Sequence, residues 1–173
     1  MPLTTTRTEL LVDGSDRKFR KLVHDFLAFT ARHEALRNGH GRRIGLAGIE
    51  YTILISIAHL GRLGPVNVKD IADHLHVSTG FVTNATRKLQ GLGLIEKQRG
   101  RADRRTTELT VTDKGLKRLE TLAPYQRQVN DAEFGSLSRE QFGQLCRIVE
   151  DLVGTSDAAL ALQKSLESDG EAS

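Results

Sequence analysis

The side chains of this sequence that are best suited to specific chemistry are hydrogen-bonding groups and cations, and they gather between Ser78 and Arg105. From Arg87 to Arg105 there are seven Lys or Arg residues and two acidic residues, a local net charge of +5. The whole chain of 173 residues carries +3, so the rest of the chain is slightly acidic. A basic stretch on an acidic body is typical of a site that binds a polyanion. The alternative is a solvated basic face without a specific partner.

The first part of this stretch, residues 79–88, has the pattern of a helix with one polar face, and we name it the reader helix. Val82, Ala85 and Leu89 recur at helical spacing and are expected to face inward, with Thr86 partly inward. The polar face suits the major groove of DNA, where asparagine pairs with adenine and threonine contacts a base or a thymine methyl group. The expected contact residues are Ser78, Thr79, Gly80, Thr83, Asn84, Arg87 and Lys88, the last two on phosphates. An ordinary amphipathic helix is the alternative for this segment alone.

The second part of the stretch has the pattern of a hairpin with a basic tip. Residues 94–98 and 107–111 change to a period of two, which predicts two short strands. Arginine at such a tip can enter the minor groove, where narrow A·T-rich DNA concentrates negative potential. We expect Asp103 to hold a neighbouring guanidinium in position. The candidates for the insertion are Arg99, Arg101, Arg104 and Arg105. A basic turn by itself favours the interpretation that it only keeps the protein soluble. Directly after a reader helix, the same turn favours DNA binding.

Further elements must hold these two segments in place. A short helix over 68–75, which Asn67 and Asp70 can cap, would brace the reader helix from behind. A first helix starts near residue 15 and should stop near Gly39, because glycine tolerates the left-handed conformation that ends helices. The other expected helices run over about 47–60, from 113 to an interruption near Pro124, and from Ser138 onward.

This element order predicts a mainly α protein with a small β-hairpin wing, that is, a winged helix-turn-helix with N- and C-terminal dimerisation helices. The apolar faces of the terminal helices exceed what a small winged helix can cover, so we expect a second copy of the chain to bury them. The expected division is 15–45 for the N-terminal dimerisation helix and loop, 46–113 for the DNA-binding domain, 114–162 for the C-terminal dimerisation helices, and 1–14 and 163–173 for flexible tails.

Residues 46–115 resemble the multiple-antibiotic-resistance regulator (MarR) family of winged helix-turn-helix transcription regulators. The matching pieces are IEYTIL, VKDIADHL, TGFVTNATRKLQGLGLI, DRR at 103–105 and LTVTDKG at 109–115. The resemblance implies an obligate homodimer with two reader helices on a palindromic site. It also implies that Asp103 braces an arginine and that Arg105 enters the minor groove. The sequence departs from the family in Thr86, where a larger aliphatic residue is usual, and in its long tails.

The resemblance further implies a small molecule, often aromatic, that binds between the dimer helices and the DNA-binding unit and releases DNA, so we expect a repressor. The glycine-rich stretch 39–45 is interpreted as a loop whose Arg42 and Arg43 would hold a carboxylate or a coenzyme A phosphate. Family members that sense aromatic acids or their thioesters bind them in this way. The expected effector residues are Phe26, Phe29, His33, Arg42, Arg43, Ile49 and Tyr51. The alternative is a solvated loop surrounded by core aromatic residues.

Other classes of function lack their residue patterns in this sequence. There is no nucleophile elbow, Walker loop, dinucleotide fingerprint or zinc signature, so we expect neither enzyme activity nor a cofactor. The histidines do not cluster at ligand spacing, and Cys146 is expected to be buried in the last helix, which disfavours metal and redox sensing. No apolar run reaches the length of a membrane span and no secretion signal is visible, so we expect a cytoplasmic protein. A winged helix whose basic wing meets an acidic protein is the competing interpretation.

Overall fold

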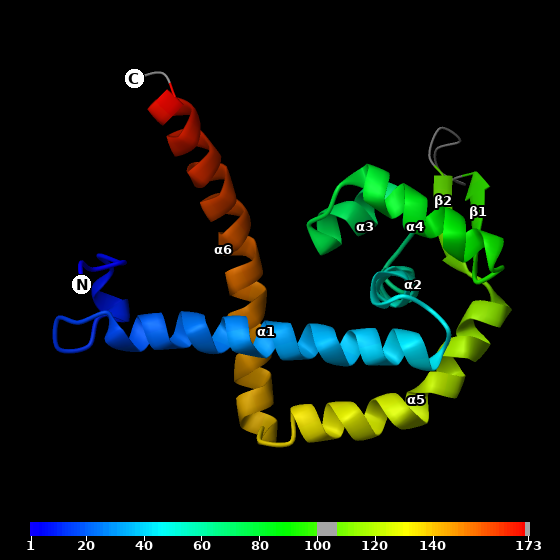
Figure 1. Ribbon diagram of the computed structural model, residues 1–173, viewed down its shortest axis with the longest axis horizontal. Helices are drawn as coiled ribbons and strands as arrows, with labels where there is room; N and C mark the ends of the chain where they lie inside the picture. The colour runs from blue at the N-terminus through cyan, green and yellow to red at the C-terminus, as the bar shows by residue number, and fades with distance from the viewer. Residues whose placement is uncertain (100–106, 172–173) are drawn as a thin grey trace. The chain divides into compact units, whose positions relative to one another are not determined.

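The computed structural model describes residues 1–99 and 107–171 (Figure 1). The chain divides into two units, Met1–Arg127 and Gln128–Ser173. The predicted fold class is confirmed, because helices dominate and a two-stranded antiparallel hairpin follows the reader helix. In chain order the elements are η1 (Thr8–Leu10), α1 (Arg17–Arg43), α2 (Gly48–Leu60), α3 (Val68–Leu75), α4 (Thr79–Gly91), β1 (Ile95–Arg99), β2 (Thr107–Val111), α5 (Asp113–Glu133) and α6 (Arg139–Glu171).

Helix α2 is the centre of the first unit because it is apolar on nearly all sides. Ile53, Leu54 and Ile57 are at most 1 % exposed. A helix that is hydrophobic all round is typical of a buried position. Helix α2 contacts α1, α4 and β2, so it is the surface on which the reader helix and the hairpin are assembled.

The two helices of the helix-turn-helix begin at side-chain caps, of which the Asn67–Asp70 pair is the predicted one. Asn67 Oδ1 accepts the backbone N–H of Asp70 at 3.1 Å, and Asp70 Oδ2 accepts the backbone N–H of Asn67 at 2.8 Å. Helix α3 ends at His76, which has a left-handed φ of 56°. Ser78 Oγ then accepts the backbone N–H of Phe81 at 3.2 Å and starts α4. These caps bond N–H groups that have no partner within a helix, so they fix where both helices begin.

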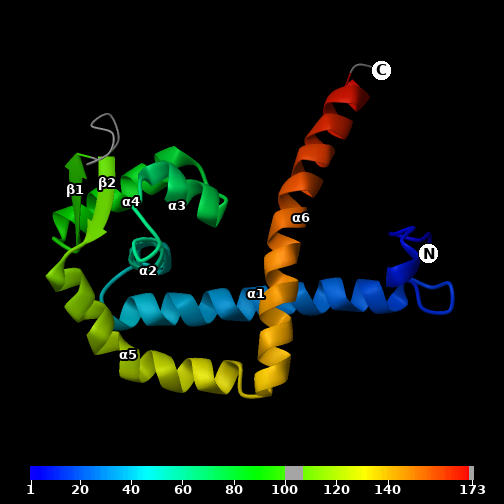
Figure 2. The same ribbon diagram turned by 180° about the vertical axis from the view of Figure 1, so that it is seen from behind.

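Strand β2 has the predicted bounds and β1 lies one residue later than predicted, and the register runs from Ile95 opposite Val111 to Arg99 opposite Thr107. It lies beside α4 in both views (Figures 1 and 2), and β1 contacts α4. The wing is therefore attached to the C-terminal end of the reader helix.

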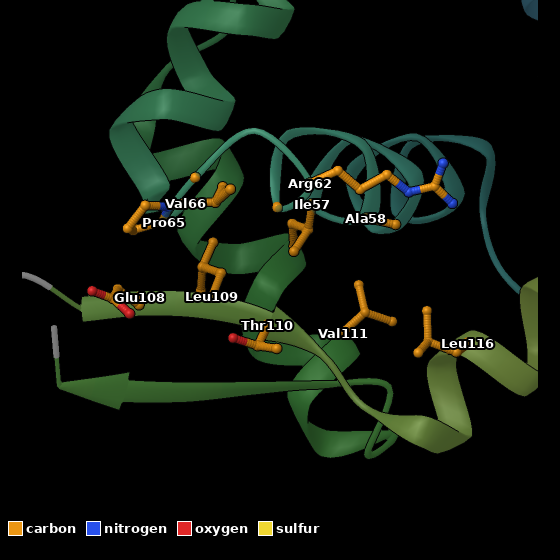
Figure 3. Close-up of a pocket in the computed structure, with 12 residues that line it drawn as sticks. Ile57, Ala58, Arg62, Pro65, Val66, Glu108, Leu109, Thr110, Val111 and Leu116 are labelled. Atoms are coloured by element: carbon orange, nitrogen blue, oxygen red, sulfur yellow. The ribbon is translucent and has the colours of Figure 1, made fainter. Parts of the chain in front are cut away.

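A groove of about 530 Å³ separates β2 from the end of α2 (Figure 3). Ile57, Val66 and Leu109 face it, and Arg62 and Glu108 also line it. The strand is tied to the α2–α3 linker because the backbone N–H of Leu109 donates to Val66 O at 2.7 Å. None of the residues predicted to bind an effector lines this groove.

The junction between the hairpin and α5 explains the end of the LTVTDKG segment. The backbone N–H of Thr112 donates to Leu94 O at 3.0 Å, and Lys114 Nζ donates to Leu92 O at 2.7 Å. A Cβ atom on Gly115 would lie 2.3 Å from Leu94 O, so only glycine fits at this position. The start of α5 is thereby bonded directly to the segment that follows α4.

Helix α1 is longer than predicted. Gly39 and Gly41 lie inside the helix, which continues to Arg43, and the left-handed residue is Gly45 with φ 70°. The predicted end near Gly39 and the predicted loop around Arg42-Arg43 are therefore wrong. The physical reason is a close approach between α1 and the segment that follows it. A Cβ atom on Gly41 would lie 2.9 Å from Leu46 O, so glycine is needed there to make room for that segment and does not end the helix.

Helix α5 is also longer than predicted, because it continues through Pro124 to Glu133. Proline removes one backbone hydrogen bond but does not end a helix that is held on both sides of it. Leu122 is fully buried, and Gln126 Nε2 donates to the Tyr51 hydroxyl at 3.0 Å, so the flanking turns are held in place.

Residues 1–15, which we name the N-terminal arm, are bonded to the start of α1. Asp16 Oδ2 accepts both the backbone N–H and the hydroxyl of Thr4, at 2.8 and 2.7 Å, and Oδ1 lies 2.6 Å from the Arg20 guanidinium. The hydrogen bonds from Thr4, and then the charge of Arg20, hold the pKa of Asp16 below its ordinary value. The arm was expected to be a flexible tail, whereas here it is fastened at one buried carboxylate.

The second unit is formed by the end of α5 and by α6. Helix α6 follows the predicted starting residue Ser138 and opens with a capping box, since Ser138 Oγ accepts the N–H of Gln141 and Gln141 Oε1 accepts the N–H of Ser138. It continues to Glu171, beyond the predicted start of a tail at residue 163. Its exposed apolar side chains are Phe142, Ile148, Val149, Leu152, Val153, Leu160, Leu162 and Leu166.

Across the described residues, no single helix has both the length and the apolarity to span a membrane. Only α1 and α2 taken together meet that test, and they are bent by 88° at their junction.

Candidate nucleic-acid interface

The inner face of the reader helix is formed by Val82, Thr86 and Leu89, all of which are 0 % exposed. Ala85 is half-buried beside them. Thr86, the residue that departs from the usual aliphatic one, donates its hydroxyl to Thr83 O at 3.0 Å, so its burial leaves no unbonded hydroxyl. This face packs on the core and fixes which side of α4 is turned to solvent.

The outer face of the reader helix brings together the predicted DNA-contact residues. Thr79, Gly80, Asn84 and Arg87 are exposed, and Arg87 Nη1 donates to Asn84 Oδ1 at 3.1 Å. Thr83 is half-buried and donates its hydroxyl to a backbone carbonyl of the same helix, so its methyl group is the part best placed for contact. Asparagine and arginine on one exposed helix face offer both donors and acceptors to base edges and phosphates.

Lys88 has a partner that the sequence did not reveal. Its Nζ lies 2.5 Å from Glu50 Oε1, although its side chain is 63 % exposed. Glu50 itself is buried in the first turn of α2, where Oε2 accepts the backbone N–H of Ala47 at 3.0 Å. The predicted phosphate contact of Lys88 therefore competes with an ion pair to the core.

Phe81 is a candidate contact residue that sequence reasoning missed. It lies in the first turn of α4, three residues before Asn84, and is 44 % exposed. A large aromatic side chain half-exposed at this point has an apolar surface suited to the methyl group of thymine. The available signal was an apolar residue outside the spacing of Val82, Ala85 and Leu89.

The wing is described only at its strands. Arg99 is exposed at the end of β1, opposite Thr107. The predicted contacts of Arg101, Asp103, Arg104 and Arg105 lie outside the described residues. The described strands place the start and the end of this basic segment side by side, next to the reader helix.

The predicted effector residues do not surround one cavity. Phe26 and Phe29 are exposed on α1, where the Phe29 ring stacks on His33 at 5.8 Å, and Arg42 is exposed. Ile49 lines a different cavity of about 310 Å³ between α1 and α2. The remaining two residues, Arg43 and Tyr51, lie at the junction of α1, α2 and α5.

That junction is an aromatic cluster around a buried histidine. His40 is 4 % exposed, and its ring meets the rings of Tyr51 and Tyr125 edge-on at 5.7 and 5.8 Å. The Arg43 guanidinium lies 5.1 Å from the centre of the Tyr125 ring. Burial raises the pKa of the Tyr51 hydroxyl, and the charge of Arg37 opposes this shift. His40 was missed because its glycine neighbours were interpreted as a loop.

Two further expectations concern metal and redox chemistry. Cys146 was expected to be buried, but it is exposed on α6 in this single chain. Within 1–99 and 107–171, no group of three or more metal-ligating side chains occurs.

Comparisons with known proteins agree with this architecture. Residues 50–107 match the model of the MarR family. The chain is 27 % identical over 117 residues to the HTH-type transcriptional regulator BilQ of Clostridium symbiosum. The matched segment covers 68 % of this chain and 81 % of that protein. A MarR protein from Peptoclostridium difficile has the same fold, with a TM-score of 0.63 and 19 % identity over 86 % of this chain and 93 % of that one. BpsR from Bordetella bronchiseptica, whose DNA binding is regulated by 6-hydroxynicotinic acid, superposes with a TM-score of 0.60 and 18 % identity over 75 % of this chain and 91 % of its own.

Proposed function

We propose that the chain is a transcription regulator of the MarR family, and that it acts as a homodimeric repressor that a small molecule releases from a palindromic operator. Its DNA-binding role is a family property, and family members are not enzymes. The observation that carries the proposal is the two-sidedness of α4. Val82, Thr86 and Leu89 on its inner side are fully buried, and the outer side is turned to solvent at Thr79, Gly80, Asn84 and Arg87.

The proposed homodimer is supported by apolar surface that each unit leaves exposed. In the first unit, α1 exposes Leu22, Val23, Phe26 and Leu27 on neighbouring turns. In the second unit, α6 exposes a longer series that includes Ile148 and Leu152. Exposed apolar side chains that recur along a helix are typical of a protein interface, and a second copy of the chain offers matching ones.

The proposed effector is an aromatic acid, or its coenzyme A thioester, bound near the junction of α1, α2 and α5. Support comes from Arg43 beside the Tyr125 ring, since a guanidinium next to an aromatic face suits an aromatic carboxylate. BpsR, which has the same fold, responds to an acid of this class. A thermal-shift screen of aromatic acids and their thioesters tests this part, and the expected result is stabilisation by a member of the series.

Selection of bound duplexes from a random DNA library, followed by fluorescence anisotropy over a salt series, tests the DNA-binding proposal. We expect this chain to select an inverted repeat and to lose affinity steeply as the salt concentration rises. The slope of log K against log salt changes by about 0.9 for each phosphate that the protein neutralises. A flat salt response and no selected sequence would favour the competing interpretation, in which the winged helix binds an acidic protein.

A further inference from the structure

Two neighbouring cations in the second half of the reader helix have different partners. Arg87 donates to Asn84 Oδ1 at 3.1 Å, a neutral acceptor that leaves the guanidinium charge in place. Lys88 Nζ lies 2.5 Å from Glu50 Oε1, a carboxylate that neutralises it. Arg87 can therefore bind a phosphate without breaking the contact of a charged partner. Lys88 must first break its ion pair with Glu50.

The Glu50 carboxylate binds two groups from different parts of the first unit. The residue is only 6 % exposed. Oε2 accepts the N–H of Ala47, which caps the first turn of α2, and Oε1 forms an ion pair with Lys88 Nζ from the last turn of α4. Removing one partner from a buried ion pair leaves an uncompensated charge, which costs far more than breaking an exposed pair. Transfer of Lys88 to a DNA phosphate would carry this cost.

We propose that Glu50 is a positioning residue for DNA recognition, which holds the end of the reader helix against α2 through Lys88. The inference rests on the proposed function, because it concerns how α4 is held for DNA. The helix is then fixed at three places: by the Ser78 cap at its start, by its buried face, and by this ion pair at its end. Lys88 acts by orienting the helix and makes no phosphate contact.

The salt dependence of DNA binding separates an orienting lysine from a phosphate-binding one. Each phosphate that a cation neutralises contributes about 0.9 to the slope of log K against log salt. For Lys88→Gln in the full chain, on a duplex selected as above, we expect an unchanged slope and an affinity lower by about tenfold, equal to about 1.4 kcal/mol. For the matched variant Arg87→Gln, we expect the slope to lose about 0.9 per subunit.

Glu50→Gln tests the other side of the ion pair. Glutamine can still accept the N–H of Ala47, but it cannot neutralise Lys88. The released lysine then becomes available to DNA, so we expect the slope to become steeper by about 0.9 per subunit. A merely structural role for Glu50 would lower the affinity without steepening the slope.

Two results would overturn the inference: a loss of slope for Lys88→Gln that equals the loss for Arg87→Gln, or an unchanged slope for Glu50→Gln. Thermal unfolding of each variant establishes that it is folded, and if Glu50→Gln does not fold, Lys88→Gln decides alone. Failure of the unmodified chain to bind any duplex at low salt would instead reject the proposed function.

Discussion

Helices α2 and α6 are both rich in apolar residues, yet a single chain treats them in opposite ways. In α2, Ile53 and Leu54 are 0 % exposed. In α6, Leu152 and Leu162 are 44 % and 60 % exposed. The winged helix therefore completes its core within one chain, whereas α6 leaves much of its apolar surface exposed. Stability of the DNA-binding domain and assembly of the proposed dimer should accordingly respond to different mutations.

The largest expected effect is on the core. Ile53→Ala removes a fully buried side chain from α2 and should lower the free energy of unfolding by about 2–5 kcal/mol. Urea unfolding followed by circular dichroism measures this change. A loss of less than about 1 kcal/mol would mean that α2 is not the centre of a completed core.

Leu152→Ala tests whether the exposed apolar face of α6 forms the proposed dimer interface. A leucine buried between two chains contributes about 1.5–3 kcal/mol, so the dissociation constant of the dimer should rise at least about tenfold. Sedimentation over a concentration series measures it, with Leu63→Ala as the control, because Leu63 is 78 % exposed in the linker after α2. Equal effects of the two substitutions would remove α6 from the interface.

Phe81 extends the comparison to the surface proposed for DNA. Replacing thymine by deoxyuridine at each operator position in turn removes one methyl group, and a buried methyl contact is worth about 0.8 kcal/mol. We expect the replacement at one position to weaken DNA binding by the unmodified protein and to leave DNA binding by the Phe81→Ala variant unchanged. If both proteins respond alike at every position, Phe81 does not contact a thymine methyl group.

The smallest expected effect concerns the N-terminal arm. The pKa of Asp16 is lowered in the folded chain, so its contribution to stability is present above the ordinary aspartate range near 4 and is lost as the pH falls through the lowered value. At neutral pH, Asp16→Asn should release the arm and speed hydrogen exchange at the Thr4 amide. Asp13→Asn is the control, because asparagine tolerates the left-handed φ of 51° at that position. Slow exchange at Thr4 in Asp16→Asn would show that the carboxylate does not hold the arm.

The sequence predicted best what local chemistry decides. The caps at Asn67 and Ser138 involve side chains and N–H groups only two or three residues apart, so they are visible in the sequence. The cap at Ser78 has the same local spacing, but that residue was interpreted only as a DNA contact. The buried face of α4 follows from the spacing of Val82 and Leu89 for the same reason.

Contacts between distant segments decided the rest. The ion pair between Glu50 and Lys88 depends on how α2 packs against α4, which no local pattern encodes. Gly41 was interpreted as a helix terminator, but the close approach of Leu46 makes it part of α1. Pro124 was interpreted as a break, but the buried Leu122 before it and the hydrogen bond of Gln126 after it hold α5 together.

The tight joint at Gly115 has a mechanical consequence. Because Thr112 is bonded to Leu94 and a side chain at Gly115 would collide with the same carbonyl, α5 cannot pivot freely against the end of α4. Helix α5 has 21 residues and is about 31 Å long, so a tilt of about 5° displaces one end by about 3 Å relative to the other. A small angular change in α5 would therefore displace the end of α4 by a distance comparable to the rise of one base pair.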